Sequence, residues 1–167
     1  MGVRIRSPSL PTVPEGFVPH YATSMDALLA FYKSARRMVI LTGAGISTES
    51  GIPDYRSPGR PPSNPMMYQD FLASLDTRRR YWGRGLIGYT RFSSAATNSG
   101  HRAVAEIQKQ GRCHGVITQN VDGFHQAAGA TNVIELHGNL HHVHCLDCGT
   151  LCPREEFQAE LIRQNQV

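Results

Sequence analysis

The sequence predicts an α/β fold built on a parallel sheet, and two observations carry this prediction. Short apolar runs typical of buried strands alternate with stretches in which apolar residues recur at helical spacing. The apolar runs lie at residues 38–42, 116–118 and 133–136. Such alternation of strands and helices along one chain is the pattern of parallel α/β sheets.

Composition fits a globular domain with its own core. The chain has 167 residues, of which 40% are hydrophobic and 18% charged, which argues against a disordered tail. The net charge is +4, but no basic run exceeds Arg78-Arg79-Arg80, so we expect no direct contact with nucleic acid. No apolar stretch approaches the roughly 20 residues of a membrane span, and we expect no membrane partner.

The N-terminal third is predicted to hold one helix, one strand and a long loop. Ser24 can cap a helix whose apolar residues, including Leu28 and Leu29, fall on one face. A buried strand follows at 38–42. Residues 47–65 are rich in Pro, Gly and Ser, and long loops inside compact domains are usually functional.

The remaining elements follow from apolar spacing and from glycines that end helices. We expect helices at 69–75, 77–87, about 101–110, 122–128 and 153–164, strands at 116–118 and 133–136, and a hairpin or knuckle at 141–148.

A glycine turn, Gly43-Ala44-Gly45-Ile46-Ser47, follows the first strand. Glycines in a strand–turn–helix unit let the backbone approach a pyrophosphate, and the helix N-terminus favours negative charge. Thr48 replaces the third glycine of the usual dinucleotide fingerprint, and no acid follows at about 20 residues to hold a ribose. The turn alone therefore fits either a phosphate site or an ordinary tight turn.

Polar residues follow the other two strands, where open α/β sheets bind ligands. The segment Gln119-Asn120-Val121-Asp122 comes after the second strand, and Glu135-Leu136-His137-Gly138 ends the third. The amides and the carboxylate suit hydrogen bonds to a sugar and a carboxamide, or the capping of a helix. His137 suits a general base near neutral pH, or a structural role.

Two of the four cysteines, Cys145 and Cys148, have the spacing C-x2-C, while Cys152 follows closely and Cys113 stands apart. Without a recognisable secretion signal, this pattern favours metal or redox chemistry over a disulfide framework. A knuckle of this kind supplies two thiolates of a tetrahedral zinc site. The alternative is a pair of reduced cysteines without a ligand.

Together these segments resemble the sirtuins, the NAD-dependent protein deacylases. GAGIS, GIPDYR, TQNVD, ELHG and C-x2-C occur in the sirtuin order between Gly43 and Cys148. Tyr55, where many members have Phe, and the run Arg79-Arg80-Tyr81-Trp82 are similar to the class II branch, which includes mitochondrial sirtuins. The resemblance implies a Rossmann-like parallel sheet, acylated lysines of proteins as substrates, mono-ADP-ribosyl transfer as a second activity, and a location in the mitochondrial matrix, with the cytoplasm as the alternative.

The resemblance also implies the roles of individual residues. The implied cofactor-binding residues lie in the glycine turn, in the loop after it and after the second strand: Gly43, Ala44, Gly45, Ile46, Ser47, Ile52, Asp54, Tyr55, Arg56, Gln119, Asn120, Val121 and Asp122. Gln119 would contact the nicotinamide ribose, and Asn120 and Asp122 would order that pocket. His137 would be the catalytic base that deprotonates a ribose hydroxyl.

The chain departs from the sirtuin pattern at its zinc ligands. Sirtuins of this type use four cysteines, but no second C-x2-C follows Cys148, so half of the ligand set is present, with Cys152 and the nearby histidines as an alternative. We expect residues 1–22 to form an irregular lead, 23–138 a partial NAD-binding domain with a cofactor-binding loop at 46–68, and 139–167 the start of a truncated zinc module. The sheet would then be incomplete, with apolar strand surface exposed. The alternative to a deacylase is a catalytically inactive fragment of the NAD site that acts only as a binding or regulatory product.

Overall fold

The computed structural model describes residues 24–54, 57–59 and 65–165, which form two compact units. The first unit, within residues 1–35, contains helix α1 (Met25–Ser34). The Ser24 hydroxyl accepts a hydrogen bond from the Ala27 N–H at 3.2 Å, which confirms the predicted cap. All other elements belong to the second unit, residues 36–167.

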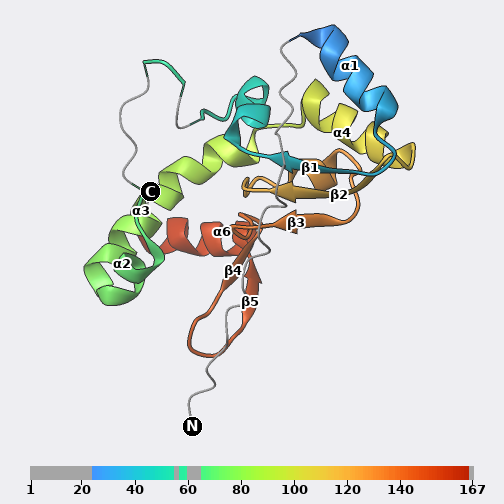
Figure 1. Cartoon of the computed structure of the whole chain (residues 1–167). Coiled ribbons are helices and arrows are strands. Elements are labelled where there is room, and N and C mark those ends of the chain that lie inside the picture. The colour runs from blue at the N-terminus through green and yellow to red at the C-terminus, as the bar shows by residue number, and fades with distance from the viewer. Residues whose placement is uncertain (1–23, 55–56, 60–64, 166–167) are drawn as a thin grey trace. The chain divides into compact units, whose positions relative to one another are not determined.

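The second unit is organised around a three-stranded parallel sheet (Figure 1). Strands β1 (Met38–Thr42), β2 (Cys113–Thr118) and β3 (Val133–Glu135) lie side by side in that order. Both strand pairs are parallel, so the predicted α/β fold with a parallel sheet is confirmed. Strand β2 begins earlier than predicted, at Cys113, whose side chain is buried.

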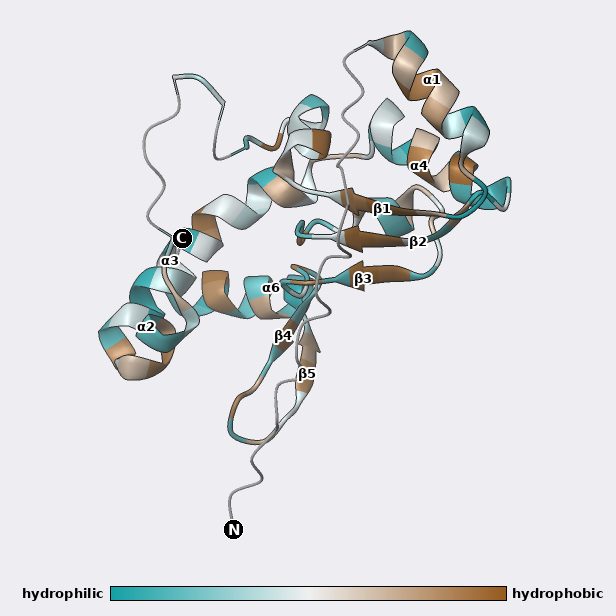
Figure 2. Ribbon diagram, viewed as in Figure 1, coloured by the Kyte–Doolittle hydropathy of each residue, from teal (hydrophilic) through white to brown (hydrophobic). Residues whose placement is uncertain are grey.

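The core lies between the sheet and α4 (Ser99–Lys109). Val104 from α4 and Val116 from β2 are buried there, and Ile40 and Val133 from the flanking strands pack against them. Figure 2 shows the apolar character of all three strands. Alternate residues of a strand point to opposite faces, and the residues beside Ile40 in β1 are exposed: Val39 by 61% and Leu41 by 64%.

Two short helices follow the first two strands. After β1 the chain forms a 3-10 helix, η1 (Ala44–Ser50), where the sequence predicted a loop from residue 47. Gly51 ends it with φ +82°, a left-handed conformation that glycine adopts without strain. After β2 the chain forms α5 (Phe124–Ala127), which is shorter than the predicted helix because Gly123, with φ +70°, precedes its first turn.

The helices α2 (Tyr68–Ala73), α3 (Leu75–Ser93) and α6 (Arg154–Asn165) belong to the same unit (Figure 1). Helix α3 runs past the predicted end at residue 87, although its three glycines lower helix propensity. Contacts with α6 offset this cost, because the Trp82 and Phe157 rings lie 4.6 Å apart and the Gly85 carbonyl accepts a bond from Arg154.

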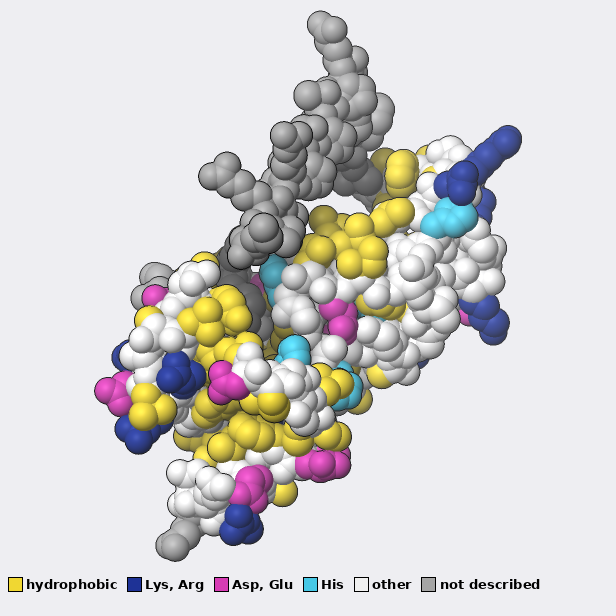
Figure 3. Space-filling view, turned by 90° about the horizontal axis from the view of Figure 1, so that it is seen from below, with side chains coloured by type: hydrophobic (Ala, Val, Ile, Leu, Met, Phe, Trp, Pro, Cys, Tyr) yellow, Lys and Arg dark blue, Asp and Glu magenta, His cyan; other side chains and the backbone are white. Residues whose placement is uncertain are grey.

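A two-stranded antiparallel hairpin precedes α6, and it extends to residue 153, past the hairpin or knuckle predicted at 141–148. It consists of β4 (His142–His144) and β5 (Leu151–Pro153). Charged side chains of both signs are scattered over the face drawn in Figure 3. Among the described residues, no helix is both long and apolar enough to span a bilayer.

Candidate active site

A cleft of about 980 Å³ opens where the three parallel strands end. Its walls come from the end of β1 and the turn after it, from the loop before α2, and from the segments that follow β2 and β3. The residues that line it are Leu41, Thr42, Gly43, Ala44, Gly45, Ile46, Asp54, Pro65, Gln119, Asn120 and His137. The glycine turn and the two polar segments that the sequence singled out therefore meet at one cleft.

The glycine turn forms one wall of this cleft. A methyl group added at Gly43 or at Gly45 would meet no atom within 4 Å, so both glycines border open space. The carbonyl of Gly43 accepts a hydrogen bond of 3.0 Å from the Asn120 side-chain amide. This bond ties the turn after β1 to the segment after β2.

Ser47 lies beneath the turn, 1% exposed, at the centre of a polar cluster. Its hydroxyl donates a hydrogen bond of 2.7 Å to Asp122 Oδ2 and accepts one of 3.0 Å from Asn120 Nδ2. The other carboxylate oxygen of Asp122 accepts the Phe124 N–H at 3.0 Å. Asn120 and Asp122 are themselves buried. Ser47 and Asp122 thus lie below the cleft wall, outside the residues that line the cleft.

A buried histidine, His101, completes this cluster. Its Nδ1 accepts the backbone N–H of Asn98 at 3.3 Å, which leaves the proton of the neutral ring on Nε2, 3.4 Å from Ser47 Oγ. Burial lowers the pKa of His101, with Arg102 acting in the same direction and Asp122 opposing both. Sequence reasoning missed His101 as part of the site. The Asn98 cap three residues before the histidine was the available signal.

A second buried histidine, His125, supports the end of β1. Its Nε2 lies 2.8 Å from Thr42 Oγ1, and the Thr42 hydroxyl in turn donates to Thr118 Oγ1 at 2.9 Å. Nε2 of His125 therefore carries the proton, and its Nδ1 has no hydrogen-bond partner among the described residues. Burial lowers the pKa of His125, the nearby His101 lowers it further, and Asp122 opposes this. Sequence reasoning missed His125, because a single histidine in a short helix carries no local signal.

His137 lies on the cleft side of the strand ends with a defined orientation. Its Nδ1 lies 2.9 Å from the backbone carbonyl of Gln119. A carbonyl oxygen only accepts hydrogen bonds, so Nδ1 carries the proton of the neutral ring. Nε2 is then left with its lone pair available. This is the arrangement that a general base requires.

The remaining predicted cofactor residues differ in position. Asp54 lines the cleft, and its Oδ2 accepts the Ser57 hydroxyl at 2.6 Å. Ile52 is buried, 7% exposed, and does not line the cleft. Val121 contributes its carbonyl to a bond with Leu140 rather than a side chain to the cleft. Tyr55 and Arg56 lie outside the described residues.

The two cysteines of the C-x2-C segment lie at the end of the hairpin. Hydrogen bonds from Thr150, and then from the Cys145 thiol, lower the pKa of Cys148. Cys152 lies opposite Val143 in the hairpin, and its thiol donates to the Pro153 carbonyl. Within the described ranges, no group of three or more histidine, cysteine or acidic side chains is arranged to hold a metal ion. These residues do not fit a complete tetrahedral zinc site.

Comparison with known proteins identifies the family. The profile of the Sir2 family matches residues 43–167. The chain belongs to the Sir2 family. This sirtuin chain is 49% identical over 140 residues to the NAD-dependent protein deacylase SIR4 of Monosiga brevicollis, covering 84% of this chain and 46% of that protein. It is 49% identical over 160 residues to the NAD-dependent protein deacetylase 1 of Streptomyces coelicolor, covering 95% of this chain and 53% of that one.

Solved structures of sirtuins share the fold. A structure of Sir2 with a p53 peptide and NAD+ superposes on this chain with a TM-score of 0.67 at 36% identity, covering 80% of this chain and 53% of that one. The predicted family and the Rossmann-like α/β fold are therefore confirmed. This sirtuin chain spans about half the length of the curated relatives it matches.

Proposed function

We propose that the chain carries the NAD-binding and catalytic face of an NAD-dependent protein-lysine deacylase. The observation that supports this best is the meeting of the glycine turn, of Gln119 and Asn120, and of His137 around one cleft. The deacylase and deacetylase names of the relatives support the same reaction class. Acylated lysines of proteins are the proposed substrates.

The cleft residues divide the binding of NAD between them. The turn from Gly43 to Ile46 borders open space and offers backbone to the pyrophosphate. Gln119 lines the cleft and would bond the ribose next to the nicotinamide. Ile52 and Asp54 would help to hold the carboxamide of nicotinamide, and Tyr55 and Arg56 would border the ribose and the phosphates.

When bound, NAD would supply a nicotinamide that carries a positive charge until its bond to the ribose breaks and then leaves as a neutral molecule, and an ADP-ribose that accepts the acyl group. The protein must orient the acyl-lysine against the ribose and remove one proton. The Gln119 carbonyl holds the proton of the His137 ring on Nδ1, which leaves the Nε2 lone pair available. Nε2 would accept this proton from a ribose hydroxyl. A positioned base of this kind typically contributes a factor of about 10²–10⁴ to the rate.

A substitution at His137 tests this proposal. His137→Ala should abolish NAD-dependent deacylation of an acyl-lysine peptide, because it removes the ring nitrogen that is proposed to take the proton. NAD affinity, measured by isothermal titration calorimetry, should change little. His142→Ala removes an exposed histidine of the hairpin and is the matched control. An equal loss of turnover and NAD affinity in His137→Ala would assign the histidine a structural role.

We also infer that Cys145 and Cys148 are two ligands of a zinc site whose other ligands do not lie in the described hairpin. No step of the proposed reaction passes through this metal. The resemblance to the class II branch supports the mitochondrial matrix as the location, and mono-ADP-ribosyl transfer as a second activity. Imaging a fluorescent fusion of the first forty residues tests the location.

A further inference from the structure

The segment Asn139–His141 lies against the backbone of the loop that carries Asp122. The Leu140 N–H donates to the Val121 carbonyl at 2.8 Å. His141 Nε2 lies 3.1 Å from the Asp122 carbonyl. Because the carbonyl only accepts, His141 Nε2 donates this bond. Two consecutive carbonyls of the loop are thus held by one short segment that follows β3.

Gly123 is matched to this histidine for two separate reasons. Its φ of +70° is a conformation that side chains other than glycine rarely adopt. In addition, a methyl group at this position would overlap His141 Nε2. The close approach of the imidazole therefore depends on the absence of a side chain at Gly123.

His141 is itself fixed from both sides. Its N–H donates to the Asn139 side chain at 3.1 Å, and Asn139 Nδ2 donates to the Glu135 carboxylate at 2.9 Å. The His141 carbonyl accepts a hydrogen bond of 2.8 Å from the N–H of Arg154, the first residue of α6. His141 therefore joins the end of β3, the start of α6 and the Asp122 loop, although the residue as a whole is exposed.

We propose that His141 is a positioning residue for the cofactor cleft. It holds the backbone of Asp122, the Asp122 carboxylate holds the Ser47 hydroxyl, and Ser47 lies beneath the glycine turn. Among the described residues, His141 forms no hydrogen bond with a residue that lines the cleft, so we expect it to act through Asp122. The expected change in NAD affinity rests on the proposed function, whereas the expected loosening of the glycine turn does not.

Three variants of the 167-residue chain test the hydrogen bond. His141→Leu removes the donor at similar volume, His141→Gln keeps an N–H donor, and His142→Leu is the matched control on the neighbouring exposed histidine. One hydrogen bond of this kind corresponds to about a fivefold change in an equilibrium constant. The dissociation constant for NAD should therefore rise about fivefold in His141→Leu. It should stay within about twofold of the wild-type value in His141→Gln and should not change in His142→Leu.

Hydrogen exchange provides a readout that does not depend on NAD. The amides of the peptide 43–51, remote from residue 141 in the sequence, should exchange faster in His141→Leu than in His142→Leu. Identical exchange and identical NAD affinity in these two variants would overturn the proposal. If exchange responds but the wild-type chain binds no NAD, the proposed function fails while the positioning of the turn by His141 stands.

A double-mutant cycle tests the steric match independently. In the wild-type background, Gly123→Ala must displace the imidazole and also strain the backbone. In a His141→Ala background only the backbone strain remains, so the loss of thermal stability caused by Gly123→Ala should be smaller there. Equal losses in the two backgrounds would show that His141 does not rest on Gly123, and would overturn the inference.

Discussion

Substitution of Ser47 by alanine probes the cluster beneath the glycine turn most directly. The change removes one oxygen from a side chain that is 1% exposed. Asp122 Oδ2 then loses its bond from Ser47 at 2.7 Å, and Asn120 Nδ2 keeps only its bond to Gly43. The backbone is unaffected, because alanine is compatible with the helical conformation of η1.

The magnitude follows from the charge on Asp122. A hydrogen bond to a charged group contributes about 1.5–3 kcal/mol, and a buried acceptor left without its partner costs a similar amount. We therefore expect Ser47→Ala to lower the free energy of unfolding by about 2–3 kcal/mol. For a chain of this size, the melting temperature should fall by about 5–10 °C.

Urea denaturation followed by the fluorescence of Trp82, the single tryptophan, measures this change. Ser93→Ala is the control, because Ser93 is exposed and, within the described part of the chain, its hydroxyl bonds only the Thr90 carbonyl of its own helix. It should shift the free energy by less than about 0.5 kcal/mol. In a double-mutant cycle with Asp122→Asn, the two losses should not add. A Ser47→Ala loss no larger than that of Ser93→Ala would refute the reasoning.

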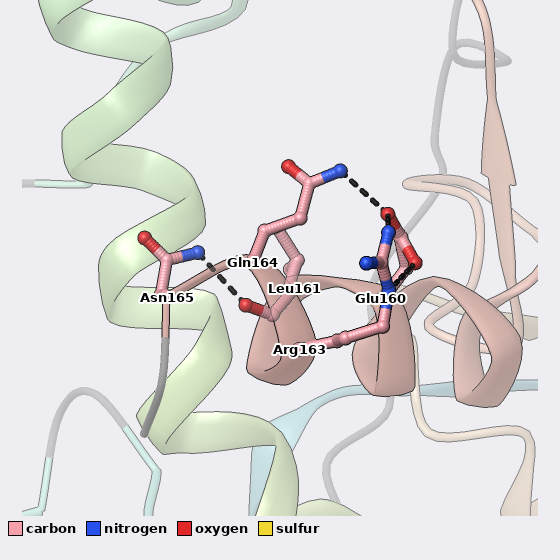
Figure 4. Close-up of polar contacts among 5 residues, drawn as sticks. All are labelled: Glu160, Leu161, Arg163, Gln164 and Asn165. Atoms are coloured by element: carbon pink, nitrogen blue, oxygen red, sulfur yellow. Dashed lines mark hydrogen bonds and ion pairs between the residues drawn. The ribbon is translucent and has the colours of Figure 1, made fainter.

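Three further predictions concern titration, a buried arginine and zinc. Burial lowers the pKa values of His101 and His125 below 6.5, so the folded state binds fewer protons than the unfolded chain. The free energy of unfolding should therefore decrease as the pH falls below about 6.5, by at most about 1.4 kcal/mol per pH unit for each histidine. Urea midpoints that do not change between about pH 7.5 and 5.5 would contradict this prediction. Arg154→Met should lower the free energy of unfolding by about 1–3 kcal/mol, because the buried guanidinium lies 4.2 Å from the centre of the Tyr89 ring and donates a hydrogen bond to the Gly85 carbonyl. Arg163→Met is the control, because it breaks the exposed ion pair with Glu160 that Figure 4 shows, and it should leave the melting temperature unchanged. Equal shifts in the two arginine variants would contradict that account. A complete zinc site binds the metal with about 10–16 kcal/mol, and two thiolates should bind it far more weakly. Zinc held by Cys145 and Cys148 alone should therefore be lost to a colorimetric chelator at micromolar concentration. Retention of one equivalent of zinc would show that further ligands are present.

The elements that the sequence predicted well are those with a strong local signal. Met38–Thr42 is an uninterrupted apolar run followed by glycine, and β1 has those same bounds. Ser24 precedes a helical apolar pattern and caps α1 through its hydroxyl. The glycine turn and the two polar segments could be placed near one another because parallel strands end at the same edge of a sheet. Their meeting at one cleft follows from the topology alone.

The elements that were predicted poorly depend on contacts between distant residues. The glycines of α3 indicate an early end, but Trp82 and Gly85 contact α6, which lies about 70 residues later in the chain. His125 shows no role until Thr42 is brought within 2.8 Å of it by the pairing of β1 with β2. The link between His141 and Gly123 is equally invisible in the sequence, because it depends on the path of the chain after β3.

The hydrogen bonds of the site separate the residues that hold it from those that can act on a ligand. Ser47, Asp122 and His101 lie below the cleft and direct their polar atoms at one another. Among the described residues, by contrast, the Gln119 side chain and His137 Nε2 make no hydrogen bond, and both residues line the cleft. A group whose bonding capacity is already satisfied inside the protein gains nothing from a ligand, whereas an oriented group with a vacant lone pair does. Changes to Ser47 or Asp122 should therefore appear first in stability and NAD affinity, and changes to His137 in the rate of the chemical step.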